Sequence, residues 1–410
     1  MPAIYVCRKC GKNHSKAEFD RSRFCKACGT FIIREYRANR SFKTSEEKTK
    51  NTIGLRRAAE SLRKRIEDTH EYEVISEQKG RTKPDFSETV SERWLWNAEY
   101  ENALKLEKEL IQQFDKKSLE EAIPGETVSN EHGNFYSIVS ECDSSFKKAG
   151  YRKSRKMLIS DLKIISGIGP VREQALKENG HYTIEDLKNH PIWQKPASEF
   201  LKLIATKDIG QIQNWLWKRL PKSHPMIHYL AGLCRDDDFA IIDIETLGLS
   251  ERPIVLMGIA KPCKNRILTH QFLVRDISDE LGAIWAFVSE LGVGSSLVSY
   301  NGRSFDIPYV KQRLAYYGMD APLNNPHFDL LHFTRRALRS KLCNCRLETV
   351  EKYLAIERGI NIPSALVPQF YQTYLKTHNV GPLVAIVEHN KQDLITLATL
   401  FSRLYKEWEV

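Results

Sequence analysis

The sequence has no long hydrophobic run. Nowhere in its 410 residues is there an apolar stretch long enough to cross a bilayer, which takes about 18 to 20 residues as a helix. The first residues, MPAIYVCRKC, also lack the pattern of a secretory signal peptide. We therefore expect a soluble, cytoplasmic protein with no membrane partner.

Cysteines are few, and heptad repeats are absent. The chain has 9 cysteines, too few for a disulfide scaffold in a protein of 410 residues. A hydrophobic content of 41% is instead enough for ordinary cores, and the length predicts about two to four domains. Because no heptad run is present, the sequence leaves the oligomeric state open.

Acidic and basic residues are unevenly distributed along the chain. The whole sequence has 62 Lys and Arg against 52 Asp and Glu, a net charge of +10. Residues 1–85 carry 21 basic and 12 acidic residues, whereas residues 231–410 carry 20 of each. A basic front end indicates a polyanionic partner such as nucleic acid, although the same charge can serve solubility alone.

Four of the cysteines form two copies of one pattern. CRKCG supplies Cys7 and Cys10, and CKACG supplies Cys25 and Cys28, with 14 residues between the pairs. Four thiolates at this spacing can share a tetrahedral site and favour zinc over paired disulfides or free thiols. Residues 1–35 resemble a zinc ribbon with one structural zinc, since four cysteines leave no open position for catalysis.

Residues 36–155 form the least informative segment. Helical periodicity is visible from Ile53 to Ile66 and over residues 91–114, with linker sequence between them. We expect a helical and basic linker region. Its end, FKKAGYRKSRK at residues 146–156, is either a solvated charge run or a phosphate contact.

Residues 156–230 contain a glycine-rich bend between two expected helices. The sequence LKIISGIGPVREQALKENG places Gly167 and Gly169 before Pro170, which is favoured at the first position of a helix. The free N–H groups at that helix start can bind an anion. The segment resembles a helix-hairpin-helix motif, although an ordinary helical hairpin fits the same pattern. The resemblance implies nucleic-acid contacts at Gly167, Gly169, Val171 and Arg172.

Residues 236–410 alternate between strand and helix patterns. Three expected strands precede the first helix, which predicts a mixed sheet that begins with a hairpin, in an α/β domain flanked by helices. The expected strands are 239–244, 253–260, 266–274 and 296–300, and the expected helices are 279–291, 306–317, 346–355, 366–377 and 381–407.

Three patterns in this segment carry carboxylates. Asp243 and Glu245 share one face of the first strand, which fits either solvent exposure or a bound cation. Asp306 follows the turn at Asn301 and also suits a helix N-cap. His389 and Asp393 lie four residues apart, on one face of the last helix, where a solvated pair is the alternative.

In this order, the patterns resemble the DEDD (DnaQ-like) exonuclease superfamily, which has a ribonuclease-H-like fold. The first motif, DIETLGLS, is closest to the predicted exonucleases called YprB-like. The resemblance implies two Mg²⁺ or Mn²⁺ ions and a two-metal hydrolysis of phosphodiester bonds. It assigns the metals to Asp243, Glu245, Asp306 and Asp393, and a place in the substrate groove to Asn301.

One residue departs from the family pattern. The family has a Tyr four residues or a His five residues before its last Asp, whereas His389 lies four residues before Asp393. His389 is the candidate catalytic base, but its imidazole could equally position water or substrate. Asp329 is expected to cap a helix rather than to bind metal.

The sequence as a whole predicts a metal-dependent 3′–5′ exonuclease, directed to its substrate by the zinc ribbon and the helix-hairpin-helix motif. The expected partner is nucleic acid, DNA in preference to RNA, as a single strand or at 3′ ends. No organic cofactor is expected. The alternatives are a non-catalytic nucleic-acid-binding adaptor that uses an inactive nuclease fold, or a structure-specific endonuclease.

Overall fold

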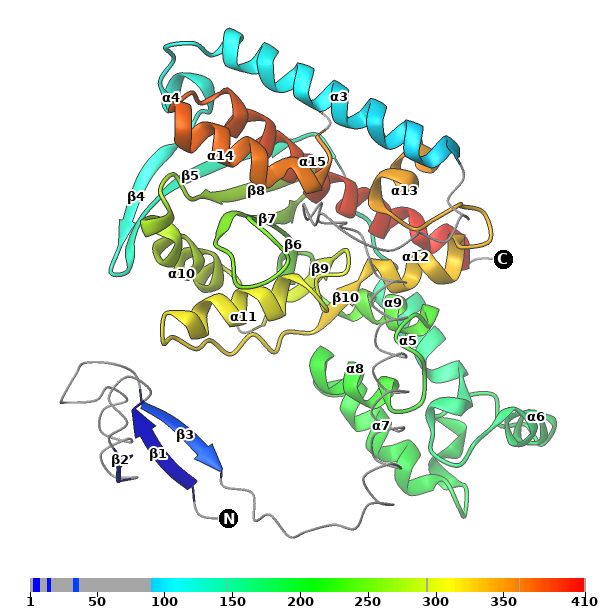
Figure 1. Ribbon diagram of the computed structural model, residues 1–410. Helices are drawn as coiled ribbons and strands as arrows, with labels where there is room; N and C mark the ends of the chain where they lie inside the picture. The colour runs from blue at the N-terminus through cyan, green and yellow to red at the C-terminus, as the bar shows by residue number, and fades with distance from the viewer. Residues whose placement is uncertain are drawn as a thin grey trace, which may run out of the picture. The chain divides into compact units, whose positions relative to one another are not determined.

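The computed structural model describes the backbone of seven ranges of the chain (Figure 1): residues 3–7, 13–15, 32–36, 90–144, 146–292, 294–360 and 362–408. Side chains are described at Ser15 and from Tyr100 onward within these ranges. The chain forms two compact units, Met1–His70 and Glu71–Val410.

The first unit contains a small antiparallel sheet. Strand β1 (Ala3–Cys7) lies between β2 (Asn13–His14) and β3 (Ile32–Tyr36). Cys7 is the last residue of β1, whereas Cys10, Cys25 and Cys28 lie outside the described residues. The zinc ribbon therefore stays a prediction.

The second unit is built on a seven-stranded mixed sheet in the order β10-β9-β6-β7-β8-β5-β4. β6, β7 and β8 pair antiparallel, while β9 and β10 run parallel to β6, which confirms the predicted mixed sheet and its hairpin start. The strands are β4 (Glu126–Asn130), β5 (Gly133–Cys142), β6 (Phe239–Thr246), β7 (Ile254–Cys263), β8 (Arg266–Leu273), β9 (Ser296–Ser299) and β10 (His327–Asp329).

Helices cover both faces of this sheet (Figure 1). One face packs on α10 (Glu280–Glu290) and α11 (Asp306–Tyr316), and the other on α14 (Val367–Thr377) and α15 (Gly381–Arg403). The remaining helices of the sheet region are α3 (Val90–Gln113), α4 (Leu119–Ala122), α12 (Leu330–Leu338) and α13 (Leu347–Leu354).

Strand β6 alternates between these two layers. Ala240, Ile242 and Ile244 belong to the core with α10 and α11, whereas Phe239 and Ile241 belong to the core with the C-terminal half of α15. Because side chains on a strand alternate between faces, Asp243 and Glu245 also face α15. The fold thus directs these two acidic side chains toward one helix.

The hairpin of β4 and β5 corrects the prediction of a helical linker over residues 36–155. β5 pairs with β8 over seven residues, so the sheet extends beyond the predicted domain limit at residue 236. The outer strand β4 has no buried side chain, which leaves little hydrophobic alternation to find. The helix expected over 91–114 is confirmed by α3.

A helical region lies between β5 and β6 in the chain. It comprises α5 (Tyr151–Ser160), α6 (Pro170–Glu178), α7 (Gln194–Thr206), α8 (Ile209–Trp217) and α9 (Pro225–Tyr229). The expected helix before Gly167 is wrong: Leu162–Ile164 form only a 3-10 turn after α5 ends. Buried residues of this region, such as Ile164 and Leu216, join one core with Phe239 and Phe401 of the sheet region.

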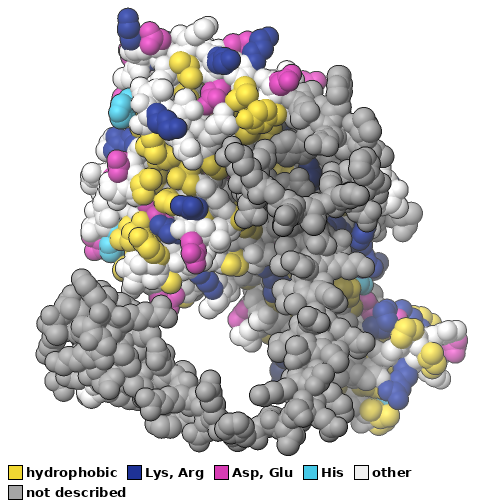
Figure 2. All heavy atoms as spheres, in the orientation of Figure 1, with side chains coloured by type: hydrophobic (Ala, Val, Ile, Leu, Met, Phe, Trp, Pro, Cys, Tyr) yellow, Lys and Arg dark blue, Asp and Glu magenta, His cyan; other side chains and the backbone are white. Residues whose placement is uncertain are grey.

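Figure 2 shows Lys and Arg side chains interspersed with Asp and Glu over the upper part of the visible face. Charge on that part of the surface therefore does not mark a binding site by itself. Among the described residues, no helix has the length and apolar composition that a membrane crossing requires.

Candidate active site

Strand β6 carries the first two predicted site residues. Asp243 and Glu245 both face α15, which packs against β6 and β7. Glu245 is buried, with 5% of its surface exposed, and Asp243 is half-buried. The pairing of β6 with β7 becomes irregular directly after Glu245, so the strand bends away where its carboxylates end.

Asp306 is the third carboxylate and the first residue of α11. The N-cap position belongs to Phe305, so the alternative in which Asp306 caps the helix is wrong. Burial raises the pKa of Asp306 to about 7, against the lowering effect of hydrogen bonds from its own N–H and from the N–H of Ile244. The bond to Ile244 ties the start of α11 to β6 between the two acidic positions of that strand.

The loop before Asp306 needs two unusual residues. Asn301 has a left-handed backbone with φ of +64°, a conformation that Asn tolerates better than most residues. A Cβ atom at Gly302 would lie 2.5 Å from Ser299 Oγ and 3.0 Å from Asp306 Oδ2, so only glycine lets the loop pass this close.

Asp329 holds the same loop from the neighbouring strand. Its carboxylate accepts hydrogen bonds from the backbone N–H groups of Asn301 at 2.9 Å and Arg303 at 3.2 Å. It also caps α12 through the N–H of Leu331 at 3.2 Å, which confirms the expected capping role. These hydrogen bonds hold the backbone of Asn301 in the loop next to Asp306.

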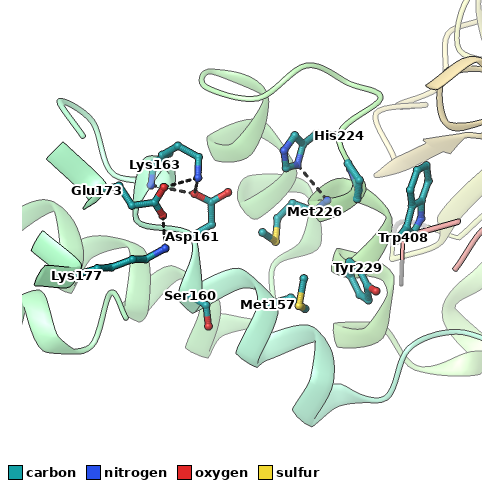
Figure 3. Close-up of a pocket in the computed structure, with 11 residues that line it drawn as sticks. Met157, Ser160, Asp161, Lys163, Glu173, Lys177, His224, Met226, Tyr229 and Trp408 are labelled. Carbon is teal, nitrogen blue, oxygen red and sulfur yellow. Dashed lines mark hydrogen bonds and ion pairs between the residues drawn. The ribbon is translucent and has the colours of Figure 1, made fainter. Parts of the chain in front are cut away.

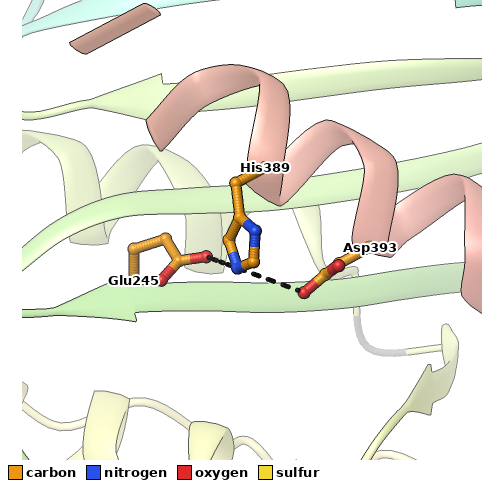
Figure 4. Close-up of side chains that lie close together, drawn as sticks. All are labelled: Glu245, His389 and Asp393. Carbon is orange, nitrogen blue, oxygen red and sulfur yellow. Dashed lines mark ion pairs between the residues drawn. The ribbon is translucent and has the colours of Figure 1, made fainter. Parts of the chain in front are cut away.

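Helix α15 brings His389 and Asp393 to the acidic face of β6. His389 Nε2 lies 3.7 Å from Glu245 Oε1 and 3.6 Å from Asp393 Oδ2, with the imidazole between the two carboxylates (Figure 4). One potential ligand atom from each of the three residues lies within 4.8 Å of the others. The predicted spacing of four residues thus places both side chains on the helix face that meets the sheet.

Burial and neighbouring carboxylates raise the pKa values of the two acids on β6. The pKa values of Asp243 and Glu245 are well above normal, first because burial disfavours the charged form. The negative charges of Asp393 and Asp306 raise both values further, and Glu245 also raises the pKa of Asp243. A cluster of buried carboxylates stays charged only when cations lie beside it. Its hard oxygen donors fit Mg²⁺ or Mn²⁺, and we infer no other cofactor from them.

Asn390 supports Asp243 and was missed by the sequence analysis. Its Nδ2 donates to Asp243 Oδ2 at 2.7 Å, while its Oδ1 accepts from Gln271 Nε2 at 2.9 Å. A Cβ atom at Gly258, the partner of Asp243 in β7, would lie 2.3 Å from Asn390 Oδ1. The buried amide therefore fixes which way the Asp243 carboxylate points.

Arg358, also missed by the sequence analysis, is the cation nearest to Asp393 among the described residues. Its buried guanidinium donates to Asp393 and makes a two-point ion pair with Glu351, at 2.5 Å from Nε and 2.9 Å from Nη2. Burial lowers the pKa of Arg358, but the two carboxylates outweigh that effect and raise it. Because Arg358 lies in a loop between α13 and α14, no local pattern marked it.

Arg358 also determines the hydrogen position on His389. Its Nη1 lies 3.1 Å from His389 Nδ1, and an arginine nitrogen can only donate. His389 Nδ1 is therefore the acceptor, and a neutral imidazole carries its hydrogen on Nε2, 3.2 Å from Ser364 Oγ. Burial first, and then Arg358, lower the pKa of His389 against the raising effect of Asp393, which favours the neutral ring.

Four of the predicted nucleic-acid contacts lie at the start of α6, in the helical region (Figure 1). Gly167 has a left-handed φ of +86°, and Gly169 is the N-cap of α6. Arg172 Nη1 donates to the carbonyl oxygen of Gly167 at 2.6 Å and so braces the bend. Val171 is 82% exposed on the first turn of α6.

Comparisons with known proteins agree with this fold. Residues 240–405 match the family model described as the RNase_H superfamily. The chain is 32% identical over 198 residues to a Bacillus subtilis (strain 168) protein named "Uncharacterized protein YprB", in line with the predicted YprB-like resemblance. The match covers 47% of each protein, so the chain spans about half the length of this curated relative. The sheet domain thus has a ribonuclease H-like fold, which is typical of nuclease-type domains.

Proposed function

We propose that this ribonuclease H-like domain is a metal-dependent 3′–5′ exonuclease of the DEDD type, acting on DNA or RNA. The observation that carries the proposal is the convergence of four acidic side chains from β6, α11 and α15, three of them buried, beside one nearby arginine. A protein that needed these residues only for folding would gain nothing from their mutual repulsion. The four are Asp243, Glu245, Asp306 and Asp393.

The donor set fits two Mg²⁺ or Mn²⁺ ions, and the same four residues would hold them. Bound there, the ions would supply charge neutralisation for the phosphodiester and a water of lowered pKa. Asn390, on α15, holds Asp243 Oδ2 by a hydrogen bond and leaves Asp243 Oδ1 available to a metal.

His389 was predicted either to accept a proton or to position other groups. The contact from Arg358 to Nδ1 supports the positioning role, because it leaves Nε2 protonated toward Glu245 and Asp393. A catalytic base needs a free lone pair directed at the water. We therefore propose that His389 orients these two carboxylates while Arg358 holds its ring.

The proposed targeting elements are the bend at Gly167 and Gly169, with Val171 and Arg172, and a zinc ribbon. The exposed first turn of α6 presents free N–H groups, as an anion-binding helix start requires. One structural zinc on the four N-terminal cysteines remains part of the proposal. Single-stranded DNA or a 3′ end is the proposed substrate.

One observation supports a second function, that of a nucleic-acid-binding adaptor without catalysis. Arg358 already pairs with Asp393, and a cation in that place compensates charge that a metal would otherwise neutralise. An adaptor would bind nucleic acid and show no cleavage with any divalent metal.

The test is a cleavage assay on single-stranded DNA and RNA, labelled at the 5′ or the 3′ end, with Mn²⁺, Mg²⁺ or EDTA. The exonuclease should release single nucleotides from the 3′ end with metal only, and Asp243→Asn or Asp306→Asn should abolish this. Asp237→Asn is the matched control, because Asp237 is exposed just before β6. Binding without metal-dependent cleavage by the wild type would support the adaptor, and internal cuts would support an endonuclease.

A further inference from the structure

Helix α8 contacts the loop that carries Asp306. The indole of Trp217, the last residue of α8, lies beneath the guanidinium of Arg303, whose central carbon is 3.8 Å from the ring centroid. Arg303 is three residues before Asp306 in the sequence and its backbone N–H is held by Asp329. This packing fixes a half-buried cation beside the start of α11.

The side chains of Lys222, His332 and Arg335 lie in the same part of the fold as Arg303. Lys222 follows α8, and His332 and Arg335 lie one turn apart on α12; the fields of Lys222, Arg303 and Arg335 all act on His332. We call Lys222, Arg303, His332 and Arg335 the junction cluster. Its members come from three separate segments, so the fold rather than a local charge run brings them together.

Lys222 and Arg303 together carry more positive charge than Asp329, their acidic neighbour, can balance. Within the described ranges, neither Lys222 nor Arg303 has a carboxylate oxygen within 4.0 Å. Asp329 is near, but its oxygens already accept three backbone N–H groups. Partial burial and then the charge of Arg303 lower the pKa of Lys222, which is the expected response of a cation near another cation.

Four other basic groups in or next to the helical region already bind carboxylates. The pocket of about 370 Å³ beside α6 contains Lys163 and Lys177, and both bind Glu173, at 2.6 and 3.0 Å (Figure 3). In the basic run at 146–156, Lys148 pairs with Asp236 and Arg155 with Glu185. These four side chains balance internal carboxylates, in contrast to Lys222 and Arg303.

We propose that the junction cluster binds the backbone phosphates of the nucleic-acid strand on its way to the carboxylate site. This inference rests on the proposed function, because it takes the same strand as its ligand. The loop that leads directly to Asp306 is flanked by lysine and arginine side chains. Such side chains can contact successive backbone phosphates without recognising the bases. Single-stranded nucleic acid is the form favoured, since a 3′ end must reach a buried carboxylate group.

The test measures binding of the full chain to a fluorescent single-stranded oligonucleotide with Ca²⁺ in place of Mg²⁺, over a series of salt concentrations. The variants are Lys222→Gln, Arg335→Gln and the double variant, and Lys376→Gln is the control. Lys376 is an exposed lysine on α14, on the sheet face opposite to α11. Each lost phosphate contact should lower the slope of log Kd against log salt by about 0.7, and the double variant by about twice that.

Cleavage assays of each variant with Mn²⁺ distinguish a failure of the junction cluster from a failure of the proposed nuclease function. The expected result is weaker binding and a higher KM for the junction variants, with the 3′ to 5′ direction retained. A wild type that binds and cleaves, with junction variants equal to the Lys376 variant, overturns the junction site alone. A wild type that neither binds nor cleaves overturns the proposed function, and the junction site with it.

Discussion

The side-chain amide of Gln213 pairs with both backbone polar groups of His327. Gln213 Nε2 donates to the carbonyl oxygen of His327 at 3.1 Å, and Gln213 Oε1 accepts from its N–H at 3.0 Å. His327 begins β10, the edge strand of the sheet, so helix α8 satisfies groups that an edge would otherwise leave unpaired. His327 Nε2 in turn lies 2.7 Å from Ser299 Oγ, which accepts the N–H of Gly302.

We expect Gln213→Ala to lower the free energy of unfolding by about 2 to 3 kcal/mol, because it leaves two buried backbone groups without partners. Urea unfolding measures the effect. Gln211→Ala, at an exposed position of the same helix, should cost less than half as much. Equal losses in the two variants would show that the pairing adds no stability.

We expect Asn390→Ala to reduce metal-dependent cleavage by about 10- to 100-fold, since Asp243 loses the donor that orients it. A titration with Mn²⁺ should show a weaker apparent metal affinity, while oligonucleotide binding stays unchanged. Asn324→Ala is the control, because Asn324 is exposed and its side chain accepts a hydrogen bond from Lys311. Full activity of the Asn390 variant would contradict the orienting role.

We expect Arg358→Gln to destabilise the metal-free protein by about 3 to 5 kcal/mol, because Glu351 and Asp393 stay buried without their cation. Mn²⁺ should restore part of this loss by replacing the charge beside Asp393. The measurement is the Tm in EDTA and in Mn²⁺, with exposed Arg346→Gln as control. A variant whose Tm falls equally in both conditions would argue against a charge shared between Arg358 and a metal.

A fourth prediction concerns pH and a site remote from the carboxylates. A hydrogen bond between His270 Nδ1 and Glu290 at 2.7 Å, opposed by burial and aided by Lys261, lowers the pKa of Glu290 from 4.5 to about 2. A carboxyl with a lowered folded pKa stabilises the fold above pH 4.5 and loses this contribution as the pH falls toward 2.

The wild type should therefore be more stable than Glu290→Gln at pH 6, and the difference should shrink steadily between pH 4.5 and pH 3. Urea unfolding at each pH gives this difference directly. Glu388→Gln, on the exposed face of α15, should show little dependence of this kind. A constant difference across the range would contradict the predicted linkage.

Most elements of the sheet domain after residue 236 were predictable from their periodicity, but β5 and α12 were not predicted. The four expected strands and five expected helices agree with β6 to β9 and with α10, α11, α13, α14 and α15. β10 has only three residues, and β4 has no buried side chain, so neither gives a periodic signal. β10 is placed by its pairing with β9, and β4 by its hairpin with β5, which pairs with the distant strand β8.

The site residues also fall into those that the sequence identifies and those that it does not. Asp243 and Glu245 stand out because two acids interrupt an apolar strand, and the order of the later motifs locates Asp306 and Asp393. Neither Arg358 nor Asn390 could be identified from the sequence, because an arginine in a loop and an asparagine on a helix are ordinary in any sequence. Their roles arise from contacts 35 and 147 residues away in the chain.

The hairpin of β4 and β5 makes the helical region an insertion in the sheet domain rather than an appendage to it. The chain leaves the sheet at Cys142 and returns at Phe239, so residues 151–230 are anchored at both ends. A segment anchored twice cannot swivel freely, as a domain on a single tether does. A shortened chain that begins at residue 236 would also strip β5 from β8 and create a new sheet edge open to aggregation.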